Sequence, residues 1–142
     1  MDSNIKSKIF EMMDQKIPLK ILKNVIDICN IDLNDKKLID SNLGNNCLLL
    51  LCKNNDIDII KYLIEEKKMD YTYKNKNDET CLSMACSYNE NLDVIKYLVE
   101  KTNSQNYTNN NMENCFLLSC KTNPNLKIIK YLLEEKKNGY AL

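Results

Sequence analysis

Three segments of this chain repeat one another almost residue for residue. Cysteines recur at a spacing of 34 residues in two rows, Cys47, Cys81, Cys115 and Cys52, Cys86, Cys120. Each pair is followed by Ile-Ile-Lys-Tyr-Leu or Val-Ile-Lys-Tyr-Leu, with the tyrosines at 62, 97 and 131. A fixed period of this length indicates a unit that cannot bury its apolar face alone and must stack on its neighbours. The sequence therefore predicts a short solenoid, in which function lies on an extended surface.

Each repeat has the pattern of helix, turn, helix and loop. In the middle copy Thr80 can cap a first short helix that runs to about Ser87, because its hydroxyl can accept a free backbone N–H. From Leu92 to about Lys101 apolar residues fall at i, i+3, i+6 and i+7, which is one face of an amphipathic helix. The polar stretches around the repeats are rich in asparagine, which tolerates the left-handed backbone of a tight turn. These patterns predict helix pairs joined by turns.

The repeats resemble the ankyrin repeat. Residues 80–86, Thr-Cys-Leu-Ser-Met-Ala-Cys, are similar to the Thr-Pro-Leu-His-x-Ala-Ala signature of that family, and residues 92–100 are similar to its second helix. Gly44 stands at the family's turn glycine, whereas Asp78 and Met112 replace it in the later copies, and cysteine replaces the signature proline. The resemblance implies an all-α, ankyrin-like helical-repeat solenoid with short hairpin-like finger loops.

The same comparison divides the chain into a cap and three repeats. The repeats occupy residues 42–142, at about 42–74, 75–108 and 109–142. Residues 1–41 are interpreted as an N-terminal helical cap, a degenerate repeat, because Ile5, Ile9 and Met12 or Met13 share a helical face and Pro18 suits a first helical position. An F-box or similar recruitment domain is the alternative for this segment, although the expected Leu-Pro opening is missing.

Composition excludes several functions. The 20 lysines balance 20 acidic residues, and there is no His, Arg or Trp, so neither a basic field nor bidentate phosphate recognition directs the chain to nucleic acid. The longest apolar run, Cys47–Cys52, is far too short for a membrane span, and the first six residues are too polar for a secretory signal. We expect an intracellular, cytoplasmic protein whose partners include no nucleic acid and no membrane.

The seven cysteines suggest two interpretations, a metal or redox site and simple packing. Cys81 and Cys86 are five residues apart, which places them on different sides of a helix, and the usual zinc-ligand spacings are absent. Free cysteine is among the most buried residue types. We expect packing, with no metal and no cofactor. We also expect no enzyme, because a cysteine nucleophile would lack its histidine.

The family resemblance implies that the chain binds another protein through finger turns and the concave ends of the first helices. Carried onto this sequence, the expected protein-binding residues are Asn42, Leu43, Asn45, Lys53, Asn54, Lys76, Asn77, Glu79, Ser87, Tyr88, Asn110, Asn111, Glu113, Lys121 and Thr122. Tyr88 is the leading candidate for a binding hot spot, flanked by Ser87, Lys53 and Lys121, because interface energy concentrates in a few aromatic or Arg side chains. The alternative is that Tyr88 only rests on the adjacent helix.

The asparagine-rich style of the repeats, with cysteine for proline, is similar to ankyrin proteins of giant DNA viruses of amoebae, and more loosely to those of AT-rich protists. A viral source would imply that the chain acts in host cytoplasm and engages a host protein. A second class of function is assembly. The last repeat has no obvious polar closing repeat after it, so the chain is expected to be a monomer or a weak homodimer that self-associates through this repeat, with Leu132 as the residue to test.

Overall fold

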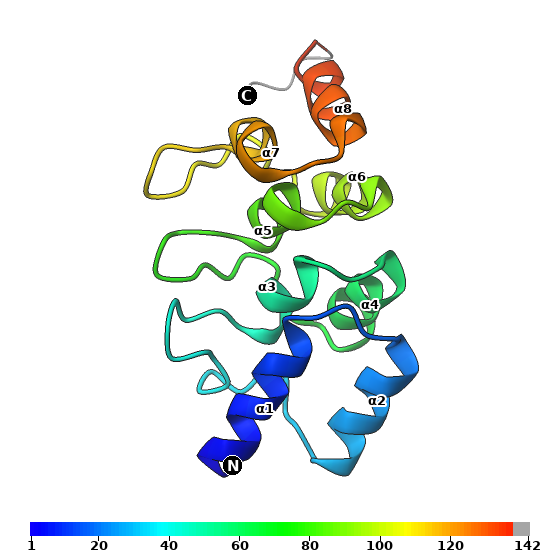
Figure 1. The fold of residues 1–142 in the computed structure, drawn as a ribbon, viewed down its shortest axis with the longest axis vertical. Coiled ribbons are helices and arrows are strands. Elements are labelled where there is room, and N and C mark those ends of the chain that lie inside the picture. Colours follow the sequence, from blue (N-terminus) through cyan, green and yellow to red (C-terminus); the bar gives the residue numbers. More distant parts are fainter. Residues whose placement is uncertain (138–142) are drawn as a thin grey trace.

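The computed structural model describes residues 1–137, which form a stack of helix pairs (Figure 1). In chain order the elements are α1 (Ser3–Met13), α2 (Leu19–Ile28), α3 (Cys47–Cys52), α4 (Ile57–Lys61), the π-helical turn η1 (Tyr62–Glu66), α5 (Cys81–Tyr88), α6 (Leu92–Thr102), α7 (Cys115–Thr122) and α8 (Leu126–Lys137). The helices α1, α3, α5 and α7 make one layer, and α2, α4, α6 and α8 make the other (Figure 1). This arrangement confirms the all-α repeat fold. Within the described residues there is no β-strand, only a bridge between Ile39 and Asn46.

The first helix of each repeat begins at a side-chain cap. Asn46, Thr80 and Asn114 occupy the N-cap positions, and each side-chain oxygen accepts the backbone N–H three residues later. At Thr80 the bond is reciprocal, because the Ser83 hydroxyl accepts the Thr80 N–H at 2.7 Å. A cap of this kind satisfies one of the orphan donors of a helix start. The cap that the sequence predicted at Thr80 is confirmed.

Five of the seven cysteines lie in the core, as expected, but two do not. Cys47, Cys52, Cys81, Cys86 and Cys115 are buried, whereas Cys29 and Cys120 are exposed. The prediction that all seven fill the core was therefore wrong for these two, since Cys29 ends α2 and Cys120 lies on the last helix pair, where the described residues place no neighbour over it. Burial raises the pKa of the Cys47 thiol to about 12. The pKa values of the Cys52 and Cys86 thiols are also raised, mainly by burial and to a lesser extent by contact with a thiol of the next repeat.

We expect thiol titration of the folded, reduced protein in dilute solution to find two fast-reacting groups, Cys29 and Cys120. A thiol reagent must reach the sulfur, so the five buried cysteines should react only after unfolding. All seven groups should then appear in denaturant. A thiol reagent followed by absorbance checks this, and more than two fast groups in the native protein would contradict the burial of the other five.

A row of buried asparagines, Asn55, Asn89 and Asn123, runs along the turns between the two helices of successive pairs. Its members are 34 residues apart, and we call them the asparagine ladder. The Asn89 amide donates to the carbonyls of Cys52 and Asn55 at 3.0 and 2.9 Å. Asn123 donates in the same way to the carbonyls of Cys86 and Asn89, at 3.1 and 2.8 Å. Each turn is thereby fastened to the turn before it. These residues were not predicted from the sequence, although their period equals that of the cysteines.

The finger loops are ordered by side chains that fold back on their own backbone. Asn75 Oδ1 accepts the N–H groups of Asn77 and Glu79 at 2.9 and 3.0 Å, and Asn109 repeats this with Asn111 and Glu113. In the first finger Asp40 accepts three consecutive N–H groups, those of residues 42–44. A side-chain oxygen that accepts nearby N–H groups therefore shapes each turn, although the first finger uses Asp40 and a different set of donors.

The turn position that is glycine in the first finger keeps its left-handed backbone in the other two. Gly44, Asp78 and Met112 have φ of 72°, 60° and 61°. A left-handed conformation costs roughly 1 to 2 kcal/mol for a residue with a Cβ, although Asp tolerates it better than Met. The departure from the family's glycine at these positions thus changes the energy of the turns without changing their shape.

Replacing Met112 with glycine should therefore stabilise the protein by about 1 kcal/mol. The Met112 side chain is exposed, so its removal loses little packing. The free energy of unfolding, measured by urea denaturation, checks this expectation. Asp78→Gly is the matched control and should gain less, because aspartate already accepts the left-handed conformation. A loss of stability in Met112→Gly would show that the methionine contributes contacts that exceed its backbone strain.

The first helix pair docks on the repeats as one of them would. Ile9 and Met13 of α1 are buried, whereas Ile5, expected on the same face, is exposed and lines a hollow with Ile28 and Cys29. The ladder extends to this pair, since Asn55 donates to Gln15 O at 3.1 Å and accepts the N–H of Ile17 at 2.8 Å. None of the helices up to residue 137 has the length and apolar character needed to cross a membrane.

Candidate protein-binding site

Finger loops and the last turns of the first helices form one continuous side of the stack, which we call the finger face (Figure 1). It consists of residues 40–46, 74–80 and 108–114 together with the ends of α3, α5 and α7. Most of the expected binding residues are exposed on it, namely Asn42, Asn54, Lys76, Asn77, Tyr88, Asn110, Asn111, Lys121 and Thr122. Leu43, Lys53, Glu79 and Glu113 are half-buried.

Two of the expected binding residues, Asn45 and Ser87, are buried. Asn45 Oδ1 accepts a hydrogen bond from the Asn75 amide at 2.8 Å, so it joins two fingers from inside. The Ser87 hydroxyl donates to the carbonyl of Ser83 at 3.0 Å within α5. Their polar atoms are used within the chain, so they support the surface and do not present groups to a partner.

Backbone hydrogen bonds hold the three fingers beside one another. The N–H of Lys76 donates to the Leu43 carbonyl at 2.9 Å, and the N–H of Asn110 donates to the Asn77 carbonyl at 3.1 Å. The Asn110 amide adds a bond to the Lys76 carbonyl at 3.1 Å. The spacing of the exposed side chains on the fingers is thus fixed before any partner arrives, which lowers the entropy cost of binding.

Tyr88 lies near the middle of the finger face, at the end of α5, and 47 % of its surface is exposed. Lys53 lies over its ring, with Nζ 5.2 Å from the centroid, and also pairs with Asp14 at 2.7 Å. Lys121, expected to flank Tyr88, pairs instead with Glu113 at 3.0 Å and lowers the pKa of that carboxyl. One cation therefore supports the ring, and the two lysines at the helix ends are neutralised by acidic neighbours.

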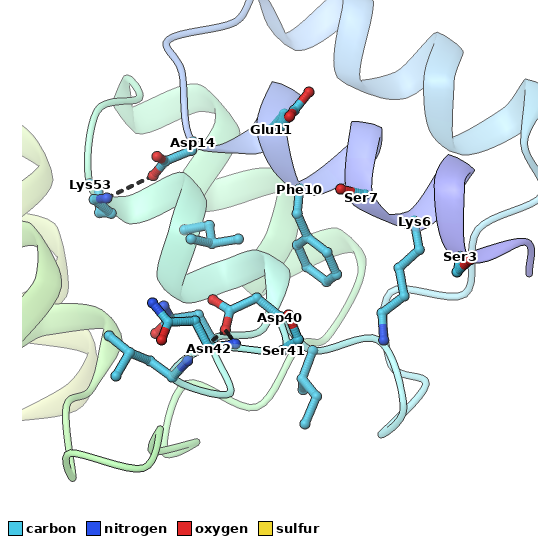
Figure 2. Close-up of a pocket in the computed structure, with 14 residues that line it drawn as sticks. Ser3, Lys6, Ser7, Phe10, Glu11, Asp14, Asp40, Ser41, Asn42 and Lys53 are labelled. Atoms are coloured by element: carbon cyan, nitrogen blue, oxygen red, sulfur yellow. Dashed lines mark hydrogen bonds and ion pairs between the residues drawn. The ribbon is translucent and has the colours of Figure 1, made fainter.

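Beside Tyr88 the finger face contains a groove of about 580 Å³ between α1, the first finger and the end of α3 (Figure 2). The Phe10 ring of α1 points toward the finger residues Asp40 and Asn42 across this groove, and Lys53 and Asp14 lie at one end (Figure 2). Its lining residues are Ser3, Lys6, Ser7, Phe10, Glu11, Asp14, Ile39, Asp40, Ser41, Asn42, Leu43, Asn45, Leu50 and Lys53.

The contribution of α1 to this groove was not predicted from the sequence. Ser3, Ser7, Phe10 and Asp14 stand at i, i+4, i+7 and i+11, which is one helical face, but the cap was interpreted from its buried apolar stripe alone. This face, in which small polar residues surround one aromatic side chain, is the sequence feature from which the groove could have been predicted. Among residues 1–137 no group of three or more His, Cys, Asp or Glu side chains is placed to hold a metal ion.

This chain is a helical-repeat protein with finger turns, and a comparison with protein families identifies its class. A model of Ankyrin repeats (3 copies) matches residues 15–111, more than half of the chain. The chain belongs to the ankyrin-repeat family, whose members generally mediate protein–protein interaction and are typically not enzymes. No curated protein matches the chain.

Proposed function

We propose that the protein is an interaction module that binds a protein partner through the finger face and its groove. The observation that carries this proposal is the half-exposed Tyr88, held by Lys53 beside fingers whose spacing is already fixed. An exposed aromatic side chain on a pre-ordered surface is the usual composition of an interface hot spot. The adjoining groove is lined in part by Phe10 and Leu50, which are largely buried and would be contacted at its base by a side chain of the partner.

The chemistry of the face favours a protein over a polyanion. Lys53 and Lys121 are paired with carboxylates, and the Lys76 ammonium donates to the Asn42 carbonyl. Asparagine amides supply most of the remaining polar groups, and they can both donate and accept. The face therefore suits hydrogen-bonded recognition around an aromatic anchor. Its lysines already contact carboxylates, a carbonyl or, for Lys74, the Tyr107 ring, so little positive charge is directed at a phosphate.

The change Tyr88→Ala should weaken binding by about 2 kcal/mol or more, which is roughly 30-fold in Kd. The melting temperature should stay nearly unchanged, since an exposed cation–π contact contributes only ~0.5 to 1 kcal/mol. The wild-type and mutant chains, used as matched baits in a cell lysate, identify by mass spectrometry a protein that only the wild type retains. Isothermal titration with that protein then gives the Kd of the wild-type chain and the Kd of the Tyr88→Ala variant.

Two controls separate the roles of Tyr88 and of the face. Tyr88→Phe keeps the ring over Lys53 and should retain most of the affinity, and Lys96→Ala alters α6, away from the finger face, and should retain all of it. Equal affinity of Tyr88→Ala and wild type, together with lower stability of the mutant, would assign Tyr88 to packing and contradict the proposal.

We further propose that the partner is a host protein in host cytoplasm. The support is the similarity of the asparagine-rich, cysteine-containing repeats to ankyrin proteins of giant DNA viruses of amoebae. Capture from an amoebal lysate tests this, with Tyr88→Ala as the negative bait. Failure to retain any amoebal protein at a bait concentration of tens of micromolar, a range in which weak complexes still form, would contradict the host-protein proposal.

A second candidate function is self-association through the last repeat. It is favoured by the exposed apolar side chains Leu117, Leu126 and Leu133 on α7 and α8. Leu132, which the sequence suggested as the test position, is fully buried in the core of the stack. A charge at Leu132 would therefore disrupt folding, and the interface has to be tested at its exposed neighbours.

A further inference from the structure

Exposed apolar side chains of the stack gather at its two ends. Among residues 1–137 the large exposed hydrophobic side chains are Met1, Ile5, Ile21, Ile28, Tyr88, Met112, Leu117, Leu126 and Leu133. Apart from Tyr88 and the finger residue Met112, all belong to the first or the last helix pair, which lie at opposite ends of the molecule (Figure 1). Singly exposed apolar residues are normal, but such a distribution indicates two faces that resemble interfaces.

The C-terminal face consists of positions that the inner repeats bury. Leu117 is 48 % exposed, whereas its equivalents Leu49 and Ser83 are 0 % and 5 % exposed because the following pair covers them. Leu133 is 40 % exposed, and its equivalents Ile64 and Val99 are each 4 % exposed. The outer side of α7 and α8 thus has the residues of an inter-repeat interface. We call it the C face.

The outer side of the first helix pair carries a second apolar stripe. On α2, Ile21 and Ile28 stand at i and i+7 and are 45 % and 83 % exposed, away from the buried Leu22 and Ile26. Val25, between them at i+4, is half-buried against the core. Ile5 of α1 shares a hollow of about 430 Å³ with Ile28 and Cys29, so the two helices contribute to one surface. We call this surface the N face, and it holds the exposed Cys29 as the C face holds the exposed Cys120.

We propose that the C face of one molecule binds the N face of a second copy of this chain, head to tail. The inner interfaces of the stack indicate this occupant. In each of them, α3 with α5 and α5 with α7, the C-terminal side of one helix pair packs on the N-terminal side of the next pair. A second copy seated in this way continues the stack with the contacts that the chain already uses. This proposal refines the self-association candidate above and does not depend on the finger face.

Head-to-tail contact has a different consequence from a symmetric dimer. The two faces of such an interface differ, so an assembly of any length keeps one free N face at one end and one free C face at the other, and the association stays open. The assembly should therefore grow with concentration instead of stopping at two chains. A C face bound to a C face would be closed and would leave the N face unused.

Complementary variants distinguish these cases by light scattering. Wild-type protein should exceed its 16.6 kDa monomer mass increasingly as its concentration rises. The double variants Ile21→Glu/Ile28→Glu and Leu117→Glu/Leu133→Glu should each be monomeric alone, because each lacks one face. Mixed in equal amounts they should form a dimer of about twice that mass, since one intact N face and one intact C face remain. Tyr88→Ala should assemble as wild type does.

Three results would overturn the proposal. A wild-type chain that stays monomeric up to millimolar concentration would show that no second copy binds. An N-face variant that still dimerises, or mixed variants that stay monomeric although each remains folded by circular dichroism, would show that the faces do not pair. A dimer lost only in the C-face variant would leave self-association standing but would assign it to a symmetric interface.

The two exposed cysteines supply an independent measurement. In reduced wild-type protein the labelling rates of Cys29 and Cys120 should both fall at least severalfold as assembly proceeds, because one lies on each face. The mixed variants should protect the two cysteines in different chains, Cys29 in the chain with the intact N face and Cys120 in the chain with the intact C face. Protection of Cys120 alone in wild type would contradict head-to-tail contact.

Discussion

Replacing Asn89 with alanine should lower the free energy of unfolding by about 3 kcal/mol. Its amide satisfies the carbonyls of Cys52 and Asn55, and its side-chain oxygen accepts the N–H of Asn91 at 2.9 Å. Leaving a buried polar group without a partner costs ~1 to 3 kcal/mol, and Asn89 is almost completely buried, so the two carbonyls gain little water in exchange. Urea denaturation followed by circular dichroism measures this loss.

A nearly isosteric variant shows whether hydrogen-bond donation or packing is responsible. Asn89→Asp keeps the shape and one acceptor but points an oxygen at two carbonyl oxygens, and we expect it to be at least as damaging as alanine. Asn106→Ala, at an exposed loop position, is the matched control and should change stability by less than about 0.5 kcal/mol. A loss below about 1 kcal/mol in both Asn89 variants would mean that the ladder adds little to the joining of the turns.

Neighbouring residues of α8 should respond very differently to the same charge. Leu132→Glu should destabilise the last repeat by about 4 kcal/mol, because Leu132 is fully buried and an unpaired carboxylate has no compensating partner there. Leu133→Glu should change stability by no more than about 0.5 kcal/mol in dilute solution, where its side chain faces water.

The measurement for this pair is the helical signal along a urea titration. A repeat protein can lose a terminal unit while the others remain folded, so Leu132→Glu should show an early partial loss that corresponds to α7 and α8. Leu133→Glu should follow the wild-type curve. Equal destabilisation by the two substitutions would show that the C face is covered in the isolated chain, and it would remove the basis for the assembly proposal.

Much of the fold could be predicted from the sequence because the same local pattern of capping and apolar residues occurs in three repeats. Thr80 as a cap and the amphipathic helix that follows Leu92 each depend on near neighbours in the chain. The family model confirms the class of fold that these patterns implied. The division into a cap and three repeats with the stated boundaries stays a prediction, and residues 138–142 lie outside the described part of the chain.

The candidate site was less accessible, because it depends on which side chains meet across repeats. Lys53 and Lys121 stand at equivalent positions, yet one lies over Tyr88 and the other pairs with Glu113. The burial of Ser87 and the part that α1 takes in the groove depend on how successive helix pairs pack together. A sequence period fixes which positions are equivalent, but not the contacts that each position makes.

The sequence by itself determined the helices, their caps, the finger turns and the period of the stack, since these depend on hydrogen bonds and apolar spacing within about one repeat. Only the tertiary structure decided exposure. Cys52, Cys86 and Cys120 are equivalent in sequence, but the first two are buried beneath the following pair and the third is exposed on the C face. Burial is a property of the neighbour that covers a residue, and in a solenoid that neighbour lies one full repeat away along the chain.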